Sequence, residues 1–526
     1  MKDKIILGVH AGHDSSACLI IGNKLVSAIE KERITRKKHD NGEPIECIEY
    51  ILINNNLSKD DIDLVVRANW WNANDLNEVY YEQFKNVIST NEHHLLHALS
   101  SYATSPFNEE FCLVIDGHGA RQIDINPNSI FYSKTFNYET ESVYIFNNGN
   151  IIEYDKRFAI NYKNKYIWGS FLNSLGYVYG IASSLIFDHA NHAGKTMGLA
   201  SLGKDNNLIP KALIYNENSF EVSDQWLDFI NKNWKLKWNT NLAKDISFAA
   251  QKELEEYYLF RIKQIFNETG IKNVSLSGGV ALNCKNNGLV ANYNFLDSAF
   301  VYNACGDSGI SLGAAVYGMY RTLGYVPKLE WSAGLGAKYK NSNKITADID
   351  KVVKLLINNE IISVFQDGSE FGPRALGNRS ILASPINSFM KDKINYKIKH
   401  RESFRPFGGS ILRKHLHIIS DDKYCSDYML SALKVKKEVF RNIESVVHID
   451  GTSRLHIVDD EDSLIGMILT KFYKLTGIPV LINTSFNDNS EPIVETFENA
   501  LETCKKNNIK YLLLPDKLID VIEAQN

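Results

Sequence analysis

Paired cysteine motifs and long apolar runs are both missing from this sequence of 526 residues. Its 7 cysteines lie far apart and form no Cys-x-x-Cys pair, which argues against a disulfide framework and a structural zinc knuckle. No stretch approaches the roughly 18 apolar residues that a membrane-spanning helix needs. The apolar run at residues 5–9 is too short for a secretory signal, because His10 and His13 follow it. We therefore expect a cytoplasmic protein with reduced thiols and no membrane segment.

An excess of charge of one sign is missing as well. Lys and Arg total 58 and Asp and Glu total 62, which gives a net charge of −4. Nucleic-acid-binding chains usually carry a basic surplus, so this balance disfavours nucleic acid as the main partner. With 44% hydrophobic residues the chain is globular rather than disordered, and its length suits two to four domains.

A strand, a polar or glycine-rich corner and a hairpin occur twice in the same order. In the first copy the strand is 4–9, the corner is 10–16 and the hairpin pairs 17–21 with 24–29. In the second copy the strand is 111–115, the corner is 116–119 and the hairpin pairs 142–146 with 150–154. Gly22-Asn23 and Asn148-Gly149 are typical two-residue hairpin turns. We interpret this pattern as an internal duplication.

Two further glycine corners follow predicted strands. Ser277-Gly-Gly279 follows the strand 273–276, and Cys305–Gly309 follows the strand 299–303. A strand that runs through such a corner into a helix presents backbone N–H groups and a positive dipole end to an anion. Plain tight turns are the alternative. The four corners, with Gly117, Gly278, Gly279 and Gly309 as candidate phosphate contacts, predict a nucleotide cleft between two duplicated lobes.

The segment Glu92–His97 carries the sharpest local signal. Ser89–Glu92 has the pattern of a capping box, which predicts a helix over about 90–104. His93 and His97 would then lie one turn apart on one face, which is the spacing that two imidazoles need to share a metal. A polar helix face with ordinary histidines is the alternative.

Two aspartates could complete such a metal site. Asp116 and Asp307 each lie in a glycine-flanked corner at the end of a predicted strand. Two histidines and two aspartates form a nitrogen and oxygen donor set that suits Fe, Mn or Zn. A cation held there would also neutralise nucleotide phosphates.

The first corner contains His13-Asp14. It could be a simple turn in which Asp14 bonds its own backbone. Alternatively, His13, with an ordinary pKa near 6.5, could take a proton from an attacking hydroxyl.

The composition changes after Pro327. Residues 330–345 are rich in Gly, Ser, Asn and Lys, and we place a domain boundary near 340, which separates domains 1–340 and 341–526. Beyond this boundary several arginines crowd a short stretch: Arg374, Arg379, Arg401, Arg405 and Arg413. They predict a second, separate site for anionic oxygens.

Taken in order, these motifs resemble the nodulation-type O-carbamoyltransferases, which include the tobramycin and cephamycin carbamoyltransferases. The matching segments are 8–17, 93–97, 116–117, 277–283, 306–307, 372–380, 399–407, 450–454 and 483–487. The resemblance implies a mixed α/β fold. Its N-terminal domain would be a duplicated, Kae-like member of the actin/sugar-kinase/Hsp70 ATPase class, and its C-terminal domain would be YrdC-like, as in threonylcarbamoyl-adenylate synthases.

The resemblance also implies a two-step reaction. ATP and carbamoyl phosphate would form carbamoyl-adenylate in the C-terminal domain, and the carbamoyl group would then pass to a hydroxyl in the N-terminal domain. The implied catalytic residues are His13, Asp14, Lys399 and Arg401. The implied nucleotide contacts are the corner glycines, Asn283, Arg374, Arg405, Arg454, Ser485 and Asn487. His93, His97, Asp116 and Asp307 would hold a divalent metal, Fe before Mn or Zn, and Mg²⁺ would accompany ATP.

Other functions remain open at this point. A sugar or metabolite kinase would share the N-terminal lobes but would leave the arginine-rich C-terminal third unexplained. A nucleotide-sensing scaffold is the non-enzymatic alternative. The hydroxyl acceptor could belong to a small molecule, a sugar, a nucleoside or a hydroxymethylated base in DNA, of which the charge balance disfavours the last. A homodimer is compatible with the sequence.

Overall fold

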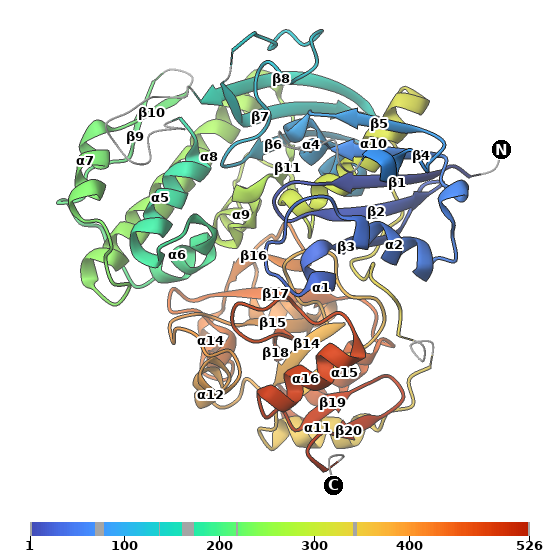
Figure 1. The fold of residues 1–526 in the computed structure, drawn as a ribbon. Helices are drawn as coiled ribbons and strands as arrows, with labels where there is room; N and C mark the ends of the chain where they lie inside the picture. Colours follow the sequence, from blue (N-terminus) through green and yellow to red (C-terminus); the bar gives the residue numbers. More distant parts are fainter. Residues whose placement is uncertain are drawn as a thin grey trace. The chain divides into compact units, whose positions relative to one another are not determined.

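A computed structural model describes residues 3–68, 78–135, 137–159, 173–216, 219–339 and 344–523, and it is mixed α/β as predicted (Figure 1). The chain divides into two compact units: unit 1 combines residues 1–88 with 329–526, and unit 2 comprises 89–328. The first 88 residues therefore pack with the C-terminal part of the chain. The predicted boundary near 340 lies outside the described residues, and the division into domains 1–340 and 341–526 stays a prediction.

Unit 1 begins with a five-stranded sheet in the order β3-β2-β1-β4-β5. Its strands are β1 (Ile5–His10), β2 (Ser16–Ile21), β3 (Lys24–Glu30), β4 (Leu64–Ala68) and β5 (Val87–Thr90), and its helices are α1 (Lys31–Thr35), α2 (Ile45–Asn54) and α3 (Glu78–Tyr81). Strand β1 is antiparallel to β2 and parallel to β4. Gly22 turns between β2 and β3 with a φ of 64°, which confirms the predicted hairpin. Cys47, Ile48 and Ile51 of α2 cover the sheet.

Unit 2 contains a second sheet of the same design, in the order β12-β11-β6-β7-β8. Its strands are β6 (Glu109–Ile115), β7 (Tyr138–Asn147), β8 (Asn150–Ala159), β11 (Asn273–Ser277) and β12 (Ser298–Val301), and β9 (Leu213–Tyr215) with β10 (Phe220–Val222) forms a separate ribbon. As in the first sheet, three strands form an antiparallel meander whose first strand pairs in parallel with a later one. The predicted duplication is confirmed by this strand order.

The helices of unit 2 are α4 (His93–Thr104), α5 (Leu175–Phe187), α6 (Ala193–Ala200), α7 (Asp224–Lys232), α8 (Asn241–Thr269), α9 (Cys284–Ala291) and α10 (Ile310–Leu323). The predicted capping box at the start of α4 is wrong. Thr90 belongs to β5, and Glu92 occupies the N-cap position without a side-chain cap bond. The Glu92 carboxylate instead accepts a hydrogen bond from the backbone N–H of Asn126, because a tertiary contact competes successfully with the local one.

The C-terminal part of unit 1 is an eight-stranded sheet in the order β16-β17-β15-β18-β14-β13-β19-β20. Its strands are β13 (Ile362–Phe365), β14 (Arg379–Ala383), β15 (Gly408–Leu412), β16 (Tyr428–Lys434), β17 (Thr452–Val458), β18 (Val480–Ser485), β19 (Tyr511–Leu513) and β20 (Leu518–Asp520). Its helices are α11 (Ile349–Ile357), α12 (Phe389–Lys397), α13 (Leu416–Ile419), α14 (Lys437–Phe440), α15 (Leu464–Thr476) and α16 (Phe497–Lys506).

Alternate residues of this sheet enter two different cores. Val480 and Ile482 of β18 join the core that contains α12 and α16, whereas Leu481 joins the core that contains α11 and α15. Helices therefore cover both faces of the sheet, as the period of two along a strand requires. None of the described helices combines the length and the apolar character needed to cross a membrane.

Candidate functional site

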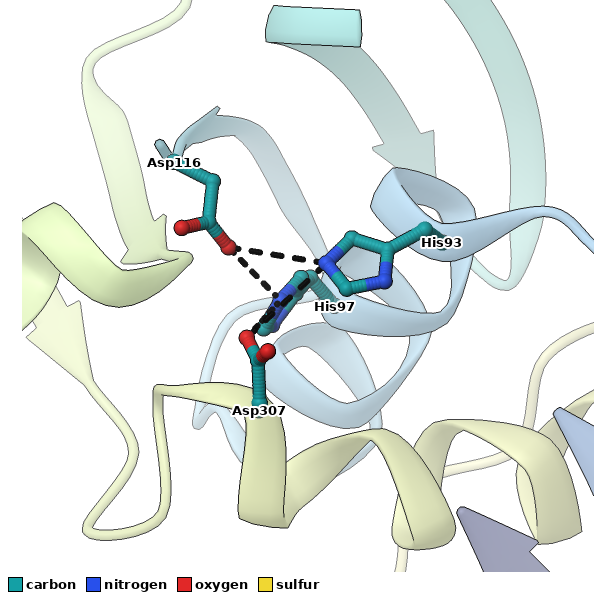
Figure 2. A group of neighbouring side chains, drawn as sticks. All are labelled: His93, His97, Asp116 and Asp307. Carbon is teal, nitrogen blue, oxygen red and sulfur yellow. Dashed lines mark ion pairs between the residues drawn. The ribbon is translucent and has the colours of Figure 1, made fainter. Parts of the chain in front are cut away.

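Four predicted metal ligands come together in unit 2. His93 and His97 lie on one face of α4, with ring centroids 4.9 Å apart. Asp116 directly follows β6, and Asp307 follows β12. Both strands pair in parallel with β11, so their carboxyl ends lie at the same edge of the sheet. Figure 2 shows the four side chains pointing toward a common centre; we call them the four-residue cluster.

The distances in the four-residue cluster suit a shared cation. Nε2 of His93 lies 3.5 Å from Oδ2 of Asp116 and 3.8 Å from Oδ1 of Asp307. Nε2 of His97 lies 3.3 Å and 3.5 Å from the same two oxygens. Donors that bind one ion at about 2.0–2.2 Å in tetrahedral geometry lie roughly 3.3 Å apart. The residues therefore fit a transition metal such as Fe, Mn or Zn.

The electrostatics of the cluster also favour a positive charge at its centre. Burial lowers the pKa of His97, but hydrogen bonding and charge from Asp116 and Asp307 outweigh burial and raise this pKa to about 9. For Asp116 burial has the opposite effect and raises the pKa, but hydrogen bonds and charge from the two imidazoles outweigh it and hold this pKa well below its ordinary value. A divalent ion would replace the imidazole protons, because metal-bound histidine is neutral.

Glycines allow the predicted nucleotide corners to approach Asp116 closely. The Gly117 N–H donates to Oδ1 of Asp116 at 2.6 Å. Gly278 has a φ of 87°, and a Cβ there would lie 2.4 Å from the carbonyl oxygen of Ile115. A Cβ on Gly279 would lie 2.9 Å from Oδ1 of Asp116. These glycines place the β11 corner beside the cluster, and their contact with a nucleotide stays a prediction.

Two other predicted nucleotide contacts have structural partners. The side chain of Asn283 caps α9 by accepting from the N–H of Asn286, and it exchanges two hydrogen bonds with Gln251. A Cβ on Gly309 would lie 1.9 Å from the carbonyl oxygen of Ala304. Capping and close packing already account for both residue types, and their nucleotide contacts stay predictions.

In unit 1, the corner after β1 holds a second group of titratable side chains, which we call the Asp14 cluster. The Asp14 carboxylate lies 2.9 Å from Nδ1 of His13 through Oδ2, and 2.7 Å from Nδ1 of His39 through Oδ1. His39 is not among the residues predicted from the sequence. It lies in a polar loop 25 residues after Asp14, and no local spacing rule links two loops at that separation.

Lys399, from one of the two residue pairs implied by the family resemblance, contacts both members of the other pair at the end of β18. Nζ of Lys399 donates to the Oγ and carbonyl oxygen of Ser485 and to two oxygens of Asn487, at 2.9 and 2.7 Å for the latter. Burial lowers the pKa of Lys399 well below its ordinary value, and the nearby charge of Arg401 lowers it further. Four oxygen atoms of Ser485 and Asn487 therefore accept from Nζ of Lys399, while burial and nearby cations act against its charge.

Three arginines form what we call the arginine group: Arg401 and Arg405, whose charges act on Lys399, and Arg454, whose charge acts on the other two arginines. Arg401 donates to Oδ1 of Asn395 at 2.6 Å and stacks over the ring of Phe407. Burial lowers the pKa of Arg401 well below its ordinary value, and the charges of Arg405 and Arg454 lower it further. Cations that repel one another in a buried place stabilise an anion bound between them.

Arg374 lies on the loop between β13 and β14. Within this loop, one carboxylate oxygen of Glu370 accepts three backbone N–H bonds. The loop is also held by the N-terminal residues of unit 1: Glu30 accepts from the Gly372 N–H at 2.5 Å, and Arg33 donates to the Gly372 carbonyl at 2.7 Å. The N-terminal segment therefore positions the loop that carries Arg374.

Two arginines of the same stretch have structural roles instead. Arg379 donates to the carbonyl of Gln366 and lies over the ring of Phe365. Arg413 pairs with Asp427 and Asp459, both at 2.9 Å through Nη2. The arginine-rich stretch of the sequence therefore contains two kinds of arginine. Some have structural partners, and others belong to the arginine group.

Comparison with known proteins agrees with the motifs. The family model of the carbamoyltransferase N-terminus matches residues 5–83 and 72–316, and that of the carbamoyltransferase C-terminus matches residues 353–520. The nodulation protein NolNO of Sinorhizobium fredii is 28% identical over 96% of this chain and 79% of its own length. An uncharacterized protein of Methanocaldococcus jannaschii is 30% identical over 99% of this chain and 100% of its own.

Solved structures also resemble part of the chain, and HypF is one of them. Full-length HypF in its phosphate- and nucleotide-bound form covers 62% of this chain with 57% of its own, at 16% identity and a TM-score of 0.41.

Proposed function

Because the chain belongs to the carbamoyltransferase family and is therefore a transferase, we propose that it forms carbamoyl-adenylate from ATP and carbamoyl phosphate and transfers the carbamoyl group to a hydroxyl. The observation that carries this proposal is the arginine group beside the Lys399, Ser485 and Asn487 contacts. Arg401 and Arg405 both lie near the carboxylate of Glu402, 3.9 Å from Arg405, yet each of them is also exposed to the repelling charge of Arg454, and all three arginines lie within the segment matched by the C-terminal family model.

The arginine group suits the adenylation step. Carbamoyl phosphate first loses inorganic phosphate to water and leaves carbamate. An oxygen of carbamate then attacks the α-phosphorus of ATP, and the bond to pyrophosphate breaks, which yields carbamoyl-adenylate. Negative charge develops on the phosphate oxygens during this attack, and Arg401, Arg405 and Arg454 would stabilise it. Arg374 would bind the same anions from its loop. Lys399 would orient Ser485 and Asn487 toward the adenylate.

The transfer step needs a deprotonated hydroxyl. His13 would take the proton from the acceptor, and Asp14 would stabilise the imidazolium that forms. The four-residue cluster would hold a divalent metal, Fe before Mn or Zn, which when bound supplies positive charge for the phosphates. Mg²⁺ would accompany ATP. The acceptor is a small molecule, a sugar or a nucleoside.

A pyrophosphate-exchange assay tests the proposal. Labelled pyrophosphate should enter ATP only when carbamoyl phosphate is present, because the reverse of adenylation needs the activated carbamoyl group. Arg374→Ala should reduce this exchange by at least about 1,000-fold, since removal of one group that stabilises developing charge costs about 100- to 1,000-fold and this group would also bind substrate. Arg413→Ala, which removes an arginine paired with two carboxylates, is the matched control and should retain exchange.

The alternatives give different results in the same assay. A kinase would release ADP without exchange, and a scaffold would turn over no ATP. Exchange at the wild-type rate in Arg374→Ala would remove that arginine from the site.

A further inference from the structure

The Asp14 cluster contains a histidine that the proposed reaction does not use. His13 and His39 are partly exposed, with side-chain exposures of 41% and 37%, and their rings stack 5.2 Å apart at 24°. Each imidazole contacts a different oxygen of Asp14, at 2.9 Å for His13 and 2.7 Å for His39. Both oxygens of one carboxylate are therefore occupied by Nδ1 atoms.

These contacts have the geometry of two hydrogen bonds. Charge-assisted N–H···O bonds are about 2.7–2.9 Å long, whereas donors that share a tetrahedral metal lie roughly 3.3 Å apart. In the Asp14 cluster the two imidazoles approach two separate oxygens. In the four-residue cluster, by contrast, each Nε2 faces the same two oxygens at 3.3 to 3.8 Å.

The loop that carries His39 is bound to the corner that carries His13. Ser15 donates its N–H to the carbonyl of Asp40 at 3.1 Å and its Oγ to the carbonyl of Gly42 at 2.6 Å. The Gly42 N–H donates to the carbonyl of Ala11 at 3.1 Å. These bonds hold His39 against Asp14 independently of the imidazole contact.

The backbone at both ends of the contact is also specific. Asp14 has a φ of 55° and His39 a φ of 56°, which are left-handed values that non-glycine residues rarely adopt. The N–H of His39 donates to the carboxylate of Glu32 at 2.8 Å. Asp and His adopt such values more readily than most residues, and the bond to Glu32 holds His39 in this conformation.

We propose that His39 is a positioning residue for His13 and acts through Asp14. By occupying Oδ1, His39 holds the carboxylate so that Oδ2 accepts from Nδ1–H of His13. This fixes the tautomer of His13 with its lone pair on Nε2, the atom that would take the proton from the acceptor hydroxyl. The catalytic meaning of this arrangement rests on the proposed function, whereas the arrangement itself can be tested without it.

Long-range proton–nitrogen correlation spectra of the full chain, with isotope-labelled histidine, test the arrangement at about pH 8, where most imidazoles are neutral. His13→Gln assigns the His13 signals. In the wild type, Nδ1 of His13 should carry the proton. In His39→Leu, which removes the donor to Asp14, we expect a mixture of both tautomers. In His39→Asn, whose side-chain N–H can still donate to Asp14, the Nδ1–H form should return. A His13 tautomer that is unchanged in His39→Leu, or not recovered in a folded His39→Asn, would overturn the proposal.

A kinetic measurement uses water as the acceptor. Release of AMP from ATP and carbamoyl phosphate should fall about tenfold in His39→Leu, a part of the 100- to 10,000-fold contribution of a general base, and should recover in His39→Asn. Pyrophosphate exchange should be equal in all three proteins. Loss of exchange together with AMP release would mean that His39 acts on folding rather than on His13. Absence of exchange in the wild type would refute the proposed function, while the spectra would still decide the role of His39.

Discussion

The two histidine–aspartate groups of this protein use the same side chains for different purposes. In the four-residue cluster, two buried imidazoles and two carboxylates converge at 3.3 to 3.8 Å, and each nitrogen faces both oxygens. In the Asp14 cluster, one partly exposed carboxylate receives two imidazoles at 2.7 and 2.9 Å, one on each oxygen. Donor atoms that converge on one point indicate a bound cation. Imidazoles that each bond to a separate carboxylate oxygen instead indicate hydrogen bonds that fix which ring nitrogen carries the proton.

Metal content should give the largest difference between variants of the four-residue cluster and variants of the Asp14 cluster. His97→Ala should lower the affinity for metal by at least about 100-fold, because removal of a ligand costs more than removal of an outer partner, which costs 10- to 100-fold. His39→Leu should retain the full metal content, and the exposed His189→Gln serves as a second control. Elemental analysis after gel filtration measures all three. Equal loss in His39→Leu would place the metal in the Asp14 cluster and reverse our assignment.

A buried carboxylate outside both clusters, that of Glu30, gives a further test through pH. Burial raises the pKa of Glu30 to about 7, although Arg33 opposes it. The folded protein then binds this proton more tightly than the unfolded chain between about pH 4.5 and 7, so stability falls as pH rises through that window. At about 1.4 kcal/mol per pH unit, the free energy of unfolding should fall by roughly 3 kcal/mol across this window.

Glu30→Gln keeps the acceptor for Gly372 and should remove this part of the pH dependence. Urea unfolding at about pH 5 and pH 8 measures it, with the exposed Glu438→Gln as control. An unchanged difference between the two pH values in Glu30→Gln would show that other groups cause the dependence.

Chelation should give the next largest effect. A metal present at 100 times its dissociation constant stabilises the folded state by about 2.7 kcal/mol. Chelators should therefore lower the melting temperature of the wild type by roughly 5–10 °C, at about 2–4 °C per kcal/mol. The melting temperature of His97→Ala should change by at most about 1–2 °C, because a 100-fold weaker site is at most half occupied under the same conditions. A chelator effect of equal size in both proteins would contradict a metal bound by His97.

The smallest expected effect concerns the arginine group, in which Arg401, Arg405 and Arg454 repel one another near the carboxylate of Glu402. Arg405→Gln should weaken pyrophosphate binding about tenfold, or 1.4 kcal/mol. It should leave the melting temperature of the anion-free protein about equal, because the relieved repulsion from Arg454 offsets the lost ion pair with Glu402, which lies 3.9 Å away. Thermal shift with pyrophosphate measures both, with Arg413→Gln as control. If Arg405→Gln lowers the melting temperature without pyrophosphate, this arginine is structural.

Much of the fold follows from local pattern. The hairpin at Gly22 and the shared face of His93 and His97 depend on geometry within a few residues. The repeated pattern of strand, corner and hairpin is also readable along the chain, and the structure agrees with each of these predictions. The capping box at Ser89–Glu92 failed because the same residues also suit the end of β5 and a contact with Asn126. Local propensity decides where no tertiary contact competes.

The pairings between distant loops had no local signal. His39 contacts Asp14 from another loop, and Glu30 and Arg33 hold a loop more than 300 residues later in the chain. Hydrogen bonds of this kind depend on which loops the strand order places together, and that information is spread over the whole chain.

The amino-acid sequence by itself determined the chemical types of the donors and their spacing within each turn or helix, because backbone dihedral preferences act over neighbouring residues. Only the tertiary structure decided which donors meet. The parallel pairing of β6, β11 and β12 places Asp116 and Asp307 at one sheet edge, opposite the two histidines of α4. The loops after β1 and α1 place two imidazoles on one carboxylate.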